Sequence, residues 1–206
     1  SDIARASVVS VDDFHELKEY LTPGRIWSVT GDGQLALGVN LDNPPRPVTV
    51  LGGDHLAPFP ILQHPQATLY RPTTSVDGQW VTFSSVDPHR GMRIFIAPFR
   101  QAQPVPVAEW IEAAEGTSPA FSHSGDRLFF TSNRDGNWCI YEQSLDPQTK
   151  RPLGEPAALA HLHGEYSAAE LPLSSFMINA SIDGLRFSLG RQQNVVSEFK
   201  RGWGRD

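Results

Sequence analysis

The sequence has few of the features that identify disulfide-stabilised, membrane-spanning or nucleic-acid-binding proteins. Cys139 is the only cysteine in 206 residues, so an intrachain disulfide is excluded. No apolar run reaches the roughly 18 residues of a membrane-spanning helix. Charged residues make up only 19% of the chain and the net charge is −6, which argues against a basic nucleic-acid-binding surface. Gly-x-Ser-x-Gly and glycine-rich phosphate-binding loops are both missing, so we predict no catalytic residue and no cofactor.

A glycine-centred pattern occurs four times along the chain. Each copy has a short strand, a tight turn that contains glycine, and a second strand with β-branched and aromatic residues. The clearest copies are residues 73–85 (TTSVDGQWVTFSS) and 120–132 (AFSHSGDRLFFTS). Successive copies are spaced close to the roughly 40–50 residues of a four-stranded propeller blade, except for a longer last interval that predicts an insertion at 161–175. The turn glycines are Gly33, Gly78, Gly125 and Gly184.

The residues around these copies predict further strands and one helix. Ser10 can cap a helix over Val11–Leu21, where Phe14 and Leu17 begin a helical spacing of apolar residues. Ala4–Val11 reads as a strand, and its pairing with the fourth copy would close a ring of four blades. Third strands are predicted at Arg46–Leu51, Met92–Phe99, Trp138–Leu145 and Val195–Phe199, and Pro-rich fourth strands at 59–62, 104–110 and 156–160.

The third copy resembles a known repeat. The stretch from Ser118 to Tyr141 (SPAFSHSGDRLFFTSNRDGNWCIY) is similar to the WD40-like (PD40) repeat of bacterial TolB-type β-propellers. It departs from that repeat at Ser122–Gly125, where the family has Ser-Pro-Asp-Gly, and at Cys139, where the family has an acidic residue. The resemblance covers about residues 25–200 and favours a periplasmic or extracytoplasmic location. Propellers of this family usually have six or more blades, so the chain is either four-bladed or part of a larger propeller, completed by further sequence or by a second chain.

We therefore predict an all-β protein: a β-propeller with four WD40-like repeats plus one short N-terminal helix. Residues 1–24 would hold the N-terminal strand and helix, with a possible closing strand. Residues 25–206 would hold the blades, at about 25–65, 66–112, 113–160 and 176–200.

Two sets of side chains are candidates for ligand contact. His161 and His163 lie two residues apart, so in a strand they share one face and with Glu165 could bind a metal ion. The alternative is that the two histidines cap an outer strand near the insertion. Asp135 and Gly136 are better explained by turn geometry than by binding. Predicted contact residues in the loops are His89, Arg90, His123, Asn133 and Arg134.

The preferred function is a non-catalytic module that binds a protein, peptide or carbohydrate through its loop face or channel. An alternative is a hydrolase or lyase that acts on glycans, which is supported by the existence of such enzymes on propeller scaffolds and by His161 and His163. A third possibility is the sensor portion of a larger bacterial signalling protein, which the resemblance alone suggests. Self-association is a further possible partner relationship, whereas nucleic acid and a membrane span are not expected.

Overall fold

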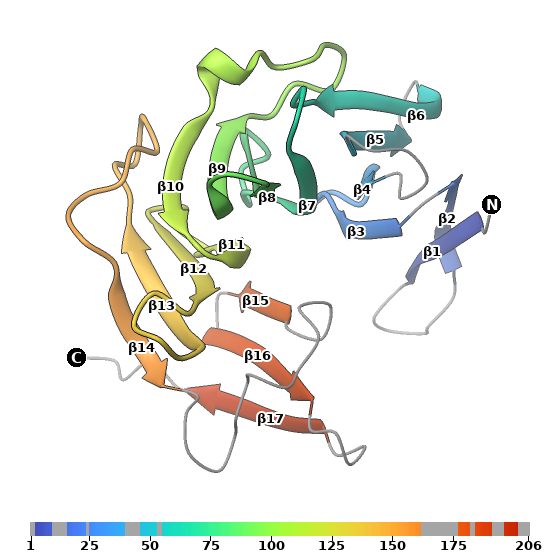
Figure 1. The fold of residues 1–206 in the computed structure, drawn as a ribbon. Coiled ribbons are helices and arrows are strands. Elements are labelled where there is room, and N and C mark those ends of the chain that lie inside the picture. The colour runs from blue at the N-terminus through green and yellow to red at the C-terminus, as the bar shows by residue number, and fades with distance from the viewer. Residues whose placement is uncertain are drawn as a thin grey trace.

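The structure is a computed structural model, and it describes residues 3–9, 16–23, 25–39, 46–52, 55–161, 177–181, 184–190 and 196–201. Antiparallel sheets follow one another along an arc, in the order of the chain (Figure 1). Three of the sheets have four strands each, and we call them blades 1 to 3. In each blade every strand pairs with the next one in sequence, which is the meander of a propeller blade. The fold is therefore β-propeller-like.

The strands of the blades have these bounds. Blade 1 is β3 (Arg25–Val29), β4 (Leu35–Val39), β5 (Val48–Gly52) and β6 (His55–Leu62); blade 2 is β7 (Thr68–Thr74), β8 (Trp80–Asp87), β9 (Gly91–Pro98) and β10 (Ile111–Glu115); blade 3 is β11 (Thr117–Phe121), β12 (Arg127–Ser132), β13 (Cys139–Ser144) and β14 (Ala157–His161). A fourth sheet, described with three strands, consists of β15 (Met177–Ser181), β16 (Gly184–Gly190) and β17 (Val196–Arg201).

The apolar core lies between neighbouring blades. Leu37 of blade 1 and Phe83 of blade 2 are both fully buried in the first core cluster. Ile96 of blade 2 and Phe130 of blade 3 are fully buried in the second. All five residues of β4 are buried, which explains why its sequence is a continuous apolar run rather than an alternating one. Packing between stacked sheets therefore sets the positions of the loops at both ends of the blades.

The turn between the first two strands of blade 2 depends on one acidic side chain. Asp77 Oδ1 accepts a hydrogen bond from Ser75 Oγ at 2.5 Å and another from the Gln79 backbone N–H at 3.0 Å. The Ser75 hydroxyl in turn accepts the Trp80 N–H at 3.0 Å. Gly78 has a φ of 66°, which favours glycine. The turn is thus held by side chains that its own sequence supplies.

The same turn in blade 3 uses an acid from a different position. In blade 1, Thr30 and Asp32 repeat the contact of blade 2, with Thr30 Oγ1 donating to Asp32 Oδ1 at 2.5 Å. In blade 3 that acid is replaced by Ser124, and Asp126, beyond the glycine, accepts the hydrogen bond of Ser122 Oγ at 3.0 Å. Ser124 also donates to Asp126. The difference from the turns of blades 1 and 2 is therefore compensated within the same loop.

Arg71 ties blade 2 to both of its neighbours. Its Nη1 donates to Ser118 Oγ of blade 3 at 2.6 Å, and its guanidinium lies 5.3 Å from the centre of the Trp27 ring of blade 1. Burial and the neighbouring charge of Arg25 lower the pKa of Arg71 to about 10. Arg71 and Ser118 have positive φ values of 52° and 57°, and each lies where the pairing register of its strand shifts. The hydrogen bond between these two residues thus joins β7 to β11 at their bulges.

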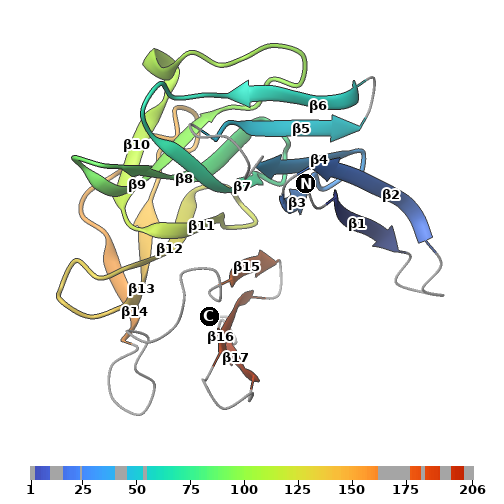
Figure 2. The ribbon, with the colours of Figure 1, turned by 45° about the vertical axis from the view of Figure 1, so that its right-hand side comes forward.

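The predicted N-terminal helix is wrong over residues 16–21. These residues lie in β2 (Glu16–Pro23), which pairs antiparallel with β1 (Ile3–Val9) and forms a hairpin beside blade 1 (Figure 2). An eleven-residue helix is marginal on its own, and the adjacent β1 gives this segment backbone hydrogen-bond partners instead. Residues 11–15 lie outside the described part of the chain. In the described residues β1 thus pairs with β2 and not with the fourth sheet, so the predicted closure by Ala4–Val11 is not found.

The fourth strand of blade 2 also differs from its prediction. We expected it at 104–110, but β10 begins at Ile111, and Val107–Glu109 forms a short 3-10 turn, η1. Pro104 and Pro106 provide no backbone N–H, so they cannot complete a ladder there. No helix in the described residues has the length and hydrophobicity needed to cross a bilayer. The predicted insertion lies almost entirely outside the described residues.

Candidate functional site

The predicted loop residues are divided between the two ends of the blades. His89 and Arg90 lie in the β8–β9 turn, and Asn133 and Arg134 lie in the β12–β13 turn. Because antiparallel strands alternate in direction, these two turns lie at the same end of neighbouring blades. His123 lies in the β11–β12 turn, at the opposite end. All five residues are exposed. Four of the five predicted residues therefore lie at one end of the blades, and His123 lies at the other. Their role in binding stays a prediction.

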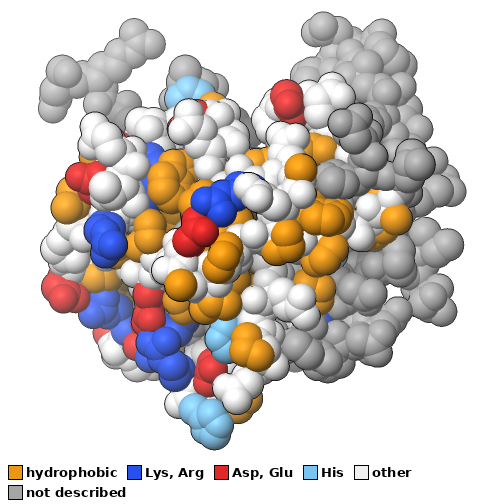
Figure 3. Space-filling model, turned by 90° about the horizontal axis from the view of Figure 1, so that it is seen from above, with side chains coloured by type: hydrophobic (Ala, Val, Ile, Leu, Met, Phe, Trp, Pro, Cys, Tyr) orange, Lys and Arg blue, Asp and Glu red, His pale blue; other side chains and the backbone are white. Residues whose placement is uncertain are grey.

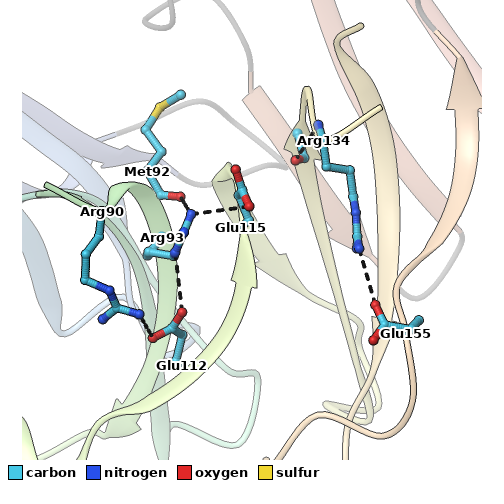
Figure 4. A network of polar contacts seen from close by, with 8 residues as sticks. Arg90, Met92, Arg93, Glu112, Glu115, Arg134 and Glu155 are labelled. Atoms are coloured by element: carbon cyan, nitrogen blue, oxygen red, sulfur yellow. Dashed lines mark hydrogen bonds and ion pairs between the residues drawn. The ribbon is translucent and has the colours of Figure 1, made fainter. Parts of the chain in front are cut away.

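The two arginines of this set form ion pairs within their own blades. Arg90 Nη2 lies 2.6 Å from Glu112 Oε2, and Arg134 Nη2 lies 3.3 Å from Glu155 Oε2 (Figure 4). Arg93 joins the blade 2 network, with contacts of 3.4 Å to Glu112 and 3.5 Å to Glu115. These pairs are at least partly exposed, so each adds little to stability, but they give Arg90, Arg93 and Arg134 each an ionic partner.

A groove lies at the other end, between blades 2 and 3. It has a volume of about 670 Å³. One wall comes from β8, η1 and β10 of blade 2, and the other from the loop that follows β13. Hydrophobic side chains form a band across the middle of the face seen in Figure 3, while acidic and basic side chains alternate along its left edge. The groove is lined by Trp80, Pro98, Ala108, Glu109, Trp110, Ile111, Glu112, Thr149, Arg151 and Pro152.

Hydrogen bonds hold the loop that forms the second wall. Asp146 Oδ1 accepts the backbone N–H groups of Gln148 at 3.1 Å and Thr149 at 2.7 Å. Lys150 is buried, and its Nζ donates to the Gly125 carbonyl at 2.7 Å, in the neighbouring turn of the same blade. The loop is therefore preorganised, and Arg151 projects from a fixed backbone.

The acidic residues of the groove have ionic partners, whereas Arg151 has none among the described residues. Glu109 is paired with Arg100, whose two terminal nitrogens lie 3.1 and 2.5 Å from its carboxylate oxygens. Glu112 is paired with Arg90 and Arg93. Arg151 is exposed and makes no ion pair with any residue that the structure describes. Among the described residues, the groove therefore has one arginine without an ionic partner, and the apolar side chains of Trp80, Trp110 and Ile111 share its lining.

Three potential metal ligands converge at the opposite end of blade 3. Cys139 Sγ lies 3.3 Å from His161 Nδ1 and 3.7 Å from Asp135 Oδ2, and His161 Nδ1 lies 3.8 Å from the same carboxylate oxygen. His161 was a predicted ligand, whereas its predicted partners His163 and Glu165 lie outside the described residues. Asp135 was interpreted as part of a turn, and Cys139 was not among the predicted ligands. Strand register is the signal that joins them, because Cys139 pairs directly with His161 across β13 and β14.

Asp135 keeps its turn role and also faces this cluster. Its Oδ1 accepts the backbone N–H of Asn137 at 3.3 Å, as the sequence predicted. Desolvation alone would raise the pKa of Asp135, but hydrogen bonds from Asn137, Tyr141 and Cys139 outweigh it and lower the pKa. Desolvation, followed by the hydrogen bond to Asp135, raises the pKa of Tyr141 to about 12. The carboxylate is therefore held ionised beside the sulfur and the imidazole.

Comparison with known proteins finds similar structures but no similar sequence family. No known family profile matches the chain, and no curated protein matches it. A protein assigned as TolB from Agrobacterium tumefaciens has a similar structure, with a TM-score of 0.53 and 11% identity over 92% of this chain and 71% of that one. TolB from Acinetobacter baumannii has a TM-score of 0.53 and 14% identity over 88% of this chain and 46% of that one. A prolyl endopeptidase structure has a TM-score of 0.51 and 12% identity over 88% of this chain and 28% of that one.

These likenesses show that the chain has a TolB-like propeller fold. It spans about half or less of two of the three similar structures, and most of the third. Since identities are at or below 14%, the comparison concerns architecture alone.

Proposed function

We propose that this chain is a non-catalytic binding module that holds a peptide segment of a partner protein in the groove between blades 2 and 3. The observation that carries the proposal is the unequal charge of that groove. Its acidic residues are paired within blade 2, while the Arg151 guanidinium has no ionic partner in the described chain.

The chemistry of the lining favours a peptide with aromatic and acidic side chains. Trp80, Trp110 and Ile111 offer partly buried apolar surface. Apolar floors with a few placed polar groups are typical of binding clefts. An arginine can bind a carboxylate through two parallel hydrogen bonds. The TolB-like resemblance further favours a periplasmic or extracytoplasmic setting for this interaction.

Two fluorescently labelled pools of ten-residue peptides test the proposal. Both contain Phe and Leu, and one adds Asp and Glu where the other adds Lys and Arg. We expect saturable binding of the acidic pool only, measured by fluorescence anisotropy. Arg151→Glu should weaken that binding by about tenfold or more, because it replaces attraction by repulsion.

The matched control is Arg25→Glu. Arg25 is an exposed arginine of blade 1 that does not line the groove, so its replacement should leave the affinity unchanged. Equal binding of the two pools, or equal affinity of the parent and the Arg151→Glu variant, would contradict the proposal.

A further inference from the structure

We propose that Asp135, Cys139 and His161 form a binding site for a divalent transition metal of the zinc class. The site lies at the far end of blade 3 from the peptide groove. It is independent of the proposed peptide binding, because it shares no residue with the groove.

The separations of the three donor atoms carry this inference. A tetrahedral Zn²⁺ with one sulfur, one nitrogen and one oxygen ligand at about 2.0–2.3 Å places those donors roughly 3.3–3.6 Å from one another. The observed separations are 3.3 Å for sulfur to nitrogen, 3.7 Å for sulfur to oxygen and 3.8 Å for nitrogen to oxygen. The three atoms therefore already lie near three corners of a tetrahedron, and a shift of a few tenths of an ångström would bring all three to bonding distance.

The fold holds each ligand from a different segment. Cys139 begins β13 and is fully buried, and His161 ends β14 at the paired position. Asp135 comes from the β12–β13 turn, where the Asn137 N–H binds its Oδ1 and leaves Oδ2 facing the sulfur and the imidazole. The Tyr141 hydroxyl also hydrogen-bonds this carboxylate. Outer contacts of this kind fix the orientation of metal ligands.

The donor set selects the class of metal. A thiolate sulfur and an imidazole nitrogen suit Zn²⁺ and similar transition metals, whereas Ca²⁺ and Mg²⁺ take oxygen ligands. On binding, the Cys139 thiol loses its proton to solvent and the sulfur forms the metal bond. His161 provides the lone pair of its Nδ1, and Asp135 provides a carboxylate oxygen. One proton is therefore released for each metal ion bound, and the two negative ligands balance the charge of the cation.

Titration of the purified, untagged chain with Co²⁺ and Zn²⁺ tests the site. We expect one equivalent of Co²⁺ to give the thiolate-to-cobalt charge-transfer band and Zn²⁺ to displace it. Calorimetry in buffers of different ionisation enthalpy should show the release of one proton. Cys139→Ser should abolish the band.

The exposed ligands keep the test valid if the buried cysteine variant fails to fold. Asp135 and His161 are exposed, so Asp135→Asn and His161→Gln should fold and weaken Zn²⁺ binding by more than about tenfold. His89→Asn, at an exposed histidine in the corresponding turn of blade 2, is the matched control and should bind like the parent. No stoichiometric binding, a band that persists in Cys139→Ser, or parent-like affinity in His161→Gln would overturn the proposal.

Discussion

Blades 2 and 3 place different chemistry at the same corner of the same backbone. In blade 2, Arg93 pairs in register with Glu115 across the two outer strands, and the two side chains form an ion pair. In blade 3 the corresponding register pair is Cys139 with His161, and Asp135 adds a carboxylate from the turn. Strand pairing is the same in both blades, so the architecture does not require either set. Equivalent positions therefore hold an ion pair in blade 2 and three potential metal ligands in blade 3.

The stacked aromatic pairs of the two blades differ by a single hydroxyl. Phe83 and Phe95 stack across β8 and β9 with ring centres 5.9 Å apart. Phe130 and Tyr141 stack at the corresponding place in blade 3, 5.8 Å apart. The added hydroxyl of Tyr141 reaches Asp135. Blade 3 thus links its aromatic core to its polar corner, which blade 2 cannot do through Phe95.

The largest expected effect on the free energy of unfolding comes from removing the equivalent buried rings, Phe83 in blade 2 and Phe130 in blade 3. Phe83→Ala and Phe130→Ala should each lower the free energy of unfolding by about 3–5 kcal/mol, because each opens a cavity in a fully buried core. Phe83→Ala should cost more, since Phe83 also contacts the Trp110 ring edge-on at 4.8 Å. Urea unfolding followed by circular dichroism measures both. A greater fall in the free energy of unfolding for Phe130→Ala than for Phe83→Ala would contradict this prediction.

Tyr141→Phe converts the blade 3 pair into the blade 2 pair. It should lower the free energy of unfolding by about 1 kcal/mol at neutral pH, since the hydrogen bond from the buried Tyr141 to the exposed Asp135 carboxylate is lost. The pKa of Tyr141 is raised from 10.0 to about 12, so the folded state retains the proton longer than the unfolded state does. Stability from the neutral hydroxyl is complete below pH 10 and is lost as the pH rises toward 12.

The difference between the parent and Tyr141→Phe should therefore narrow over that alkaline range. Urea unfolding of both proteins at a series of pH values measures it. A difference that stays constant above pH 10 would show that the hydroxyl is not the source of the effect.

The smallest effect is expected from exchanging the turn acid of blade 3 for that of blade 2. The double variant Ser124→Asp with Asp126→Ser moves the carboxylate to the position that Asp77 has in blade 2, and should change the free energy of unfolding by less than about 0.5 kcal/mol. Asp126→Ala alone should lower it by about 1 kcal/mol, because the Ser122 hydroxyl loses its acceptor. Thermal unfolding of the three proteins separates these outcomes. Equal losses in the single and double variants would show that the two positions are not equivalent.

Acid should lower the stability that the turn carboxylates Asp77 and Asp126 contribute in blades 2 and 3. The hydrogen bond from Ser75 holds the pKa of Asp77 below its ordinary value of 3.8, and that from Ser124 does the same for Asp126. Each carboxylate therefore adds stability that is present above that value and is lost as the pH falls through the lowered pKa.

The repeating strands could be predicted because their signals are local. A turn glycine with a neighbouring acid and a following apolar run marks each copy, and β4 has the predicted bounds, Leu35–Val39. The helix prediction failed because apolar spacing over eleven residues fits both structures, and the partner strand β1 decided between them. The strand prediction at 104–110 was wrong for a related reason, since a Pro-rich edge strand and an extended loop have similar sequences.

The sequence by itself determined the repeat, the turns and the propeller class, since each depends on residues within about 50 positions of one another. Only the tertiary structure decided which side chains meet. His161 was recognised from its neighbour His163, yet its contacts are Cys139 and Asp135, more than twenty residues earlier in the chain. Arg151 gained significance only when its loop was placed opposite η1 across the groove. Strand register and the stacking of blades bring such residues together, and neither is encoded by the spacing of any single motif.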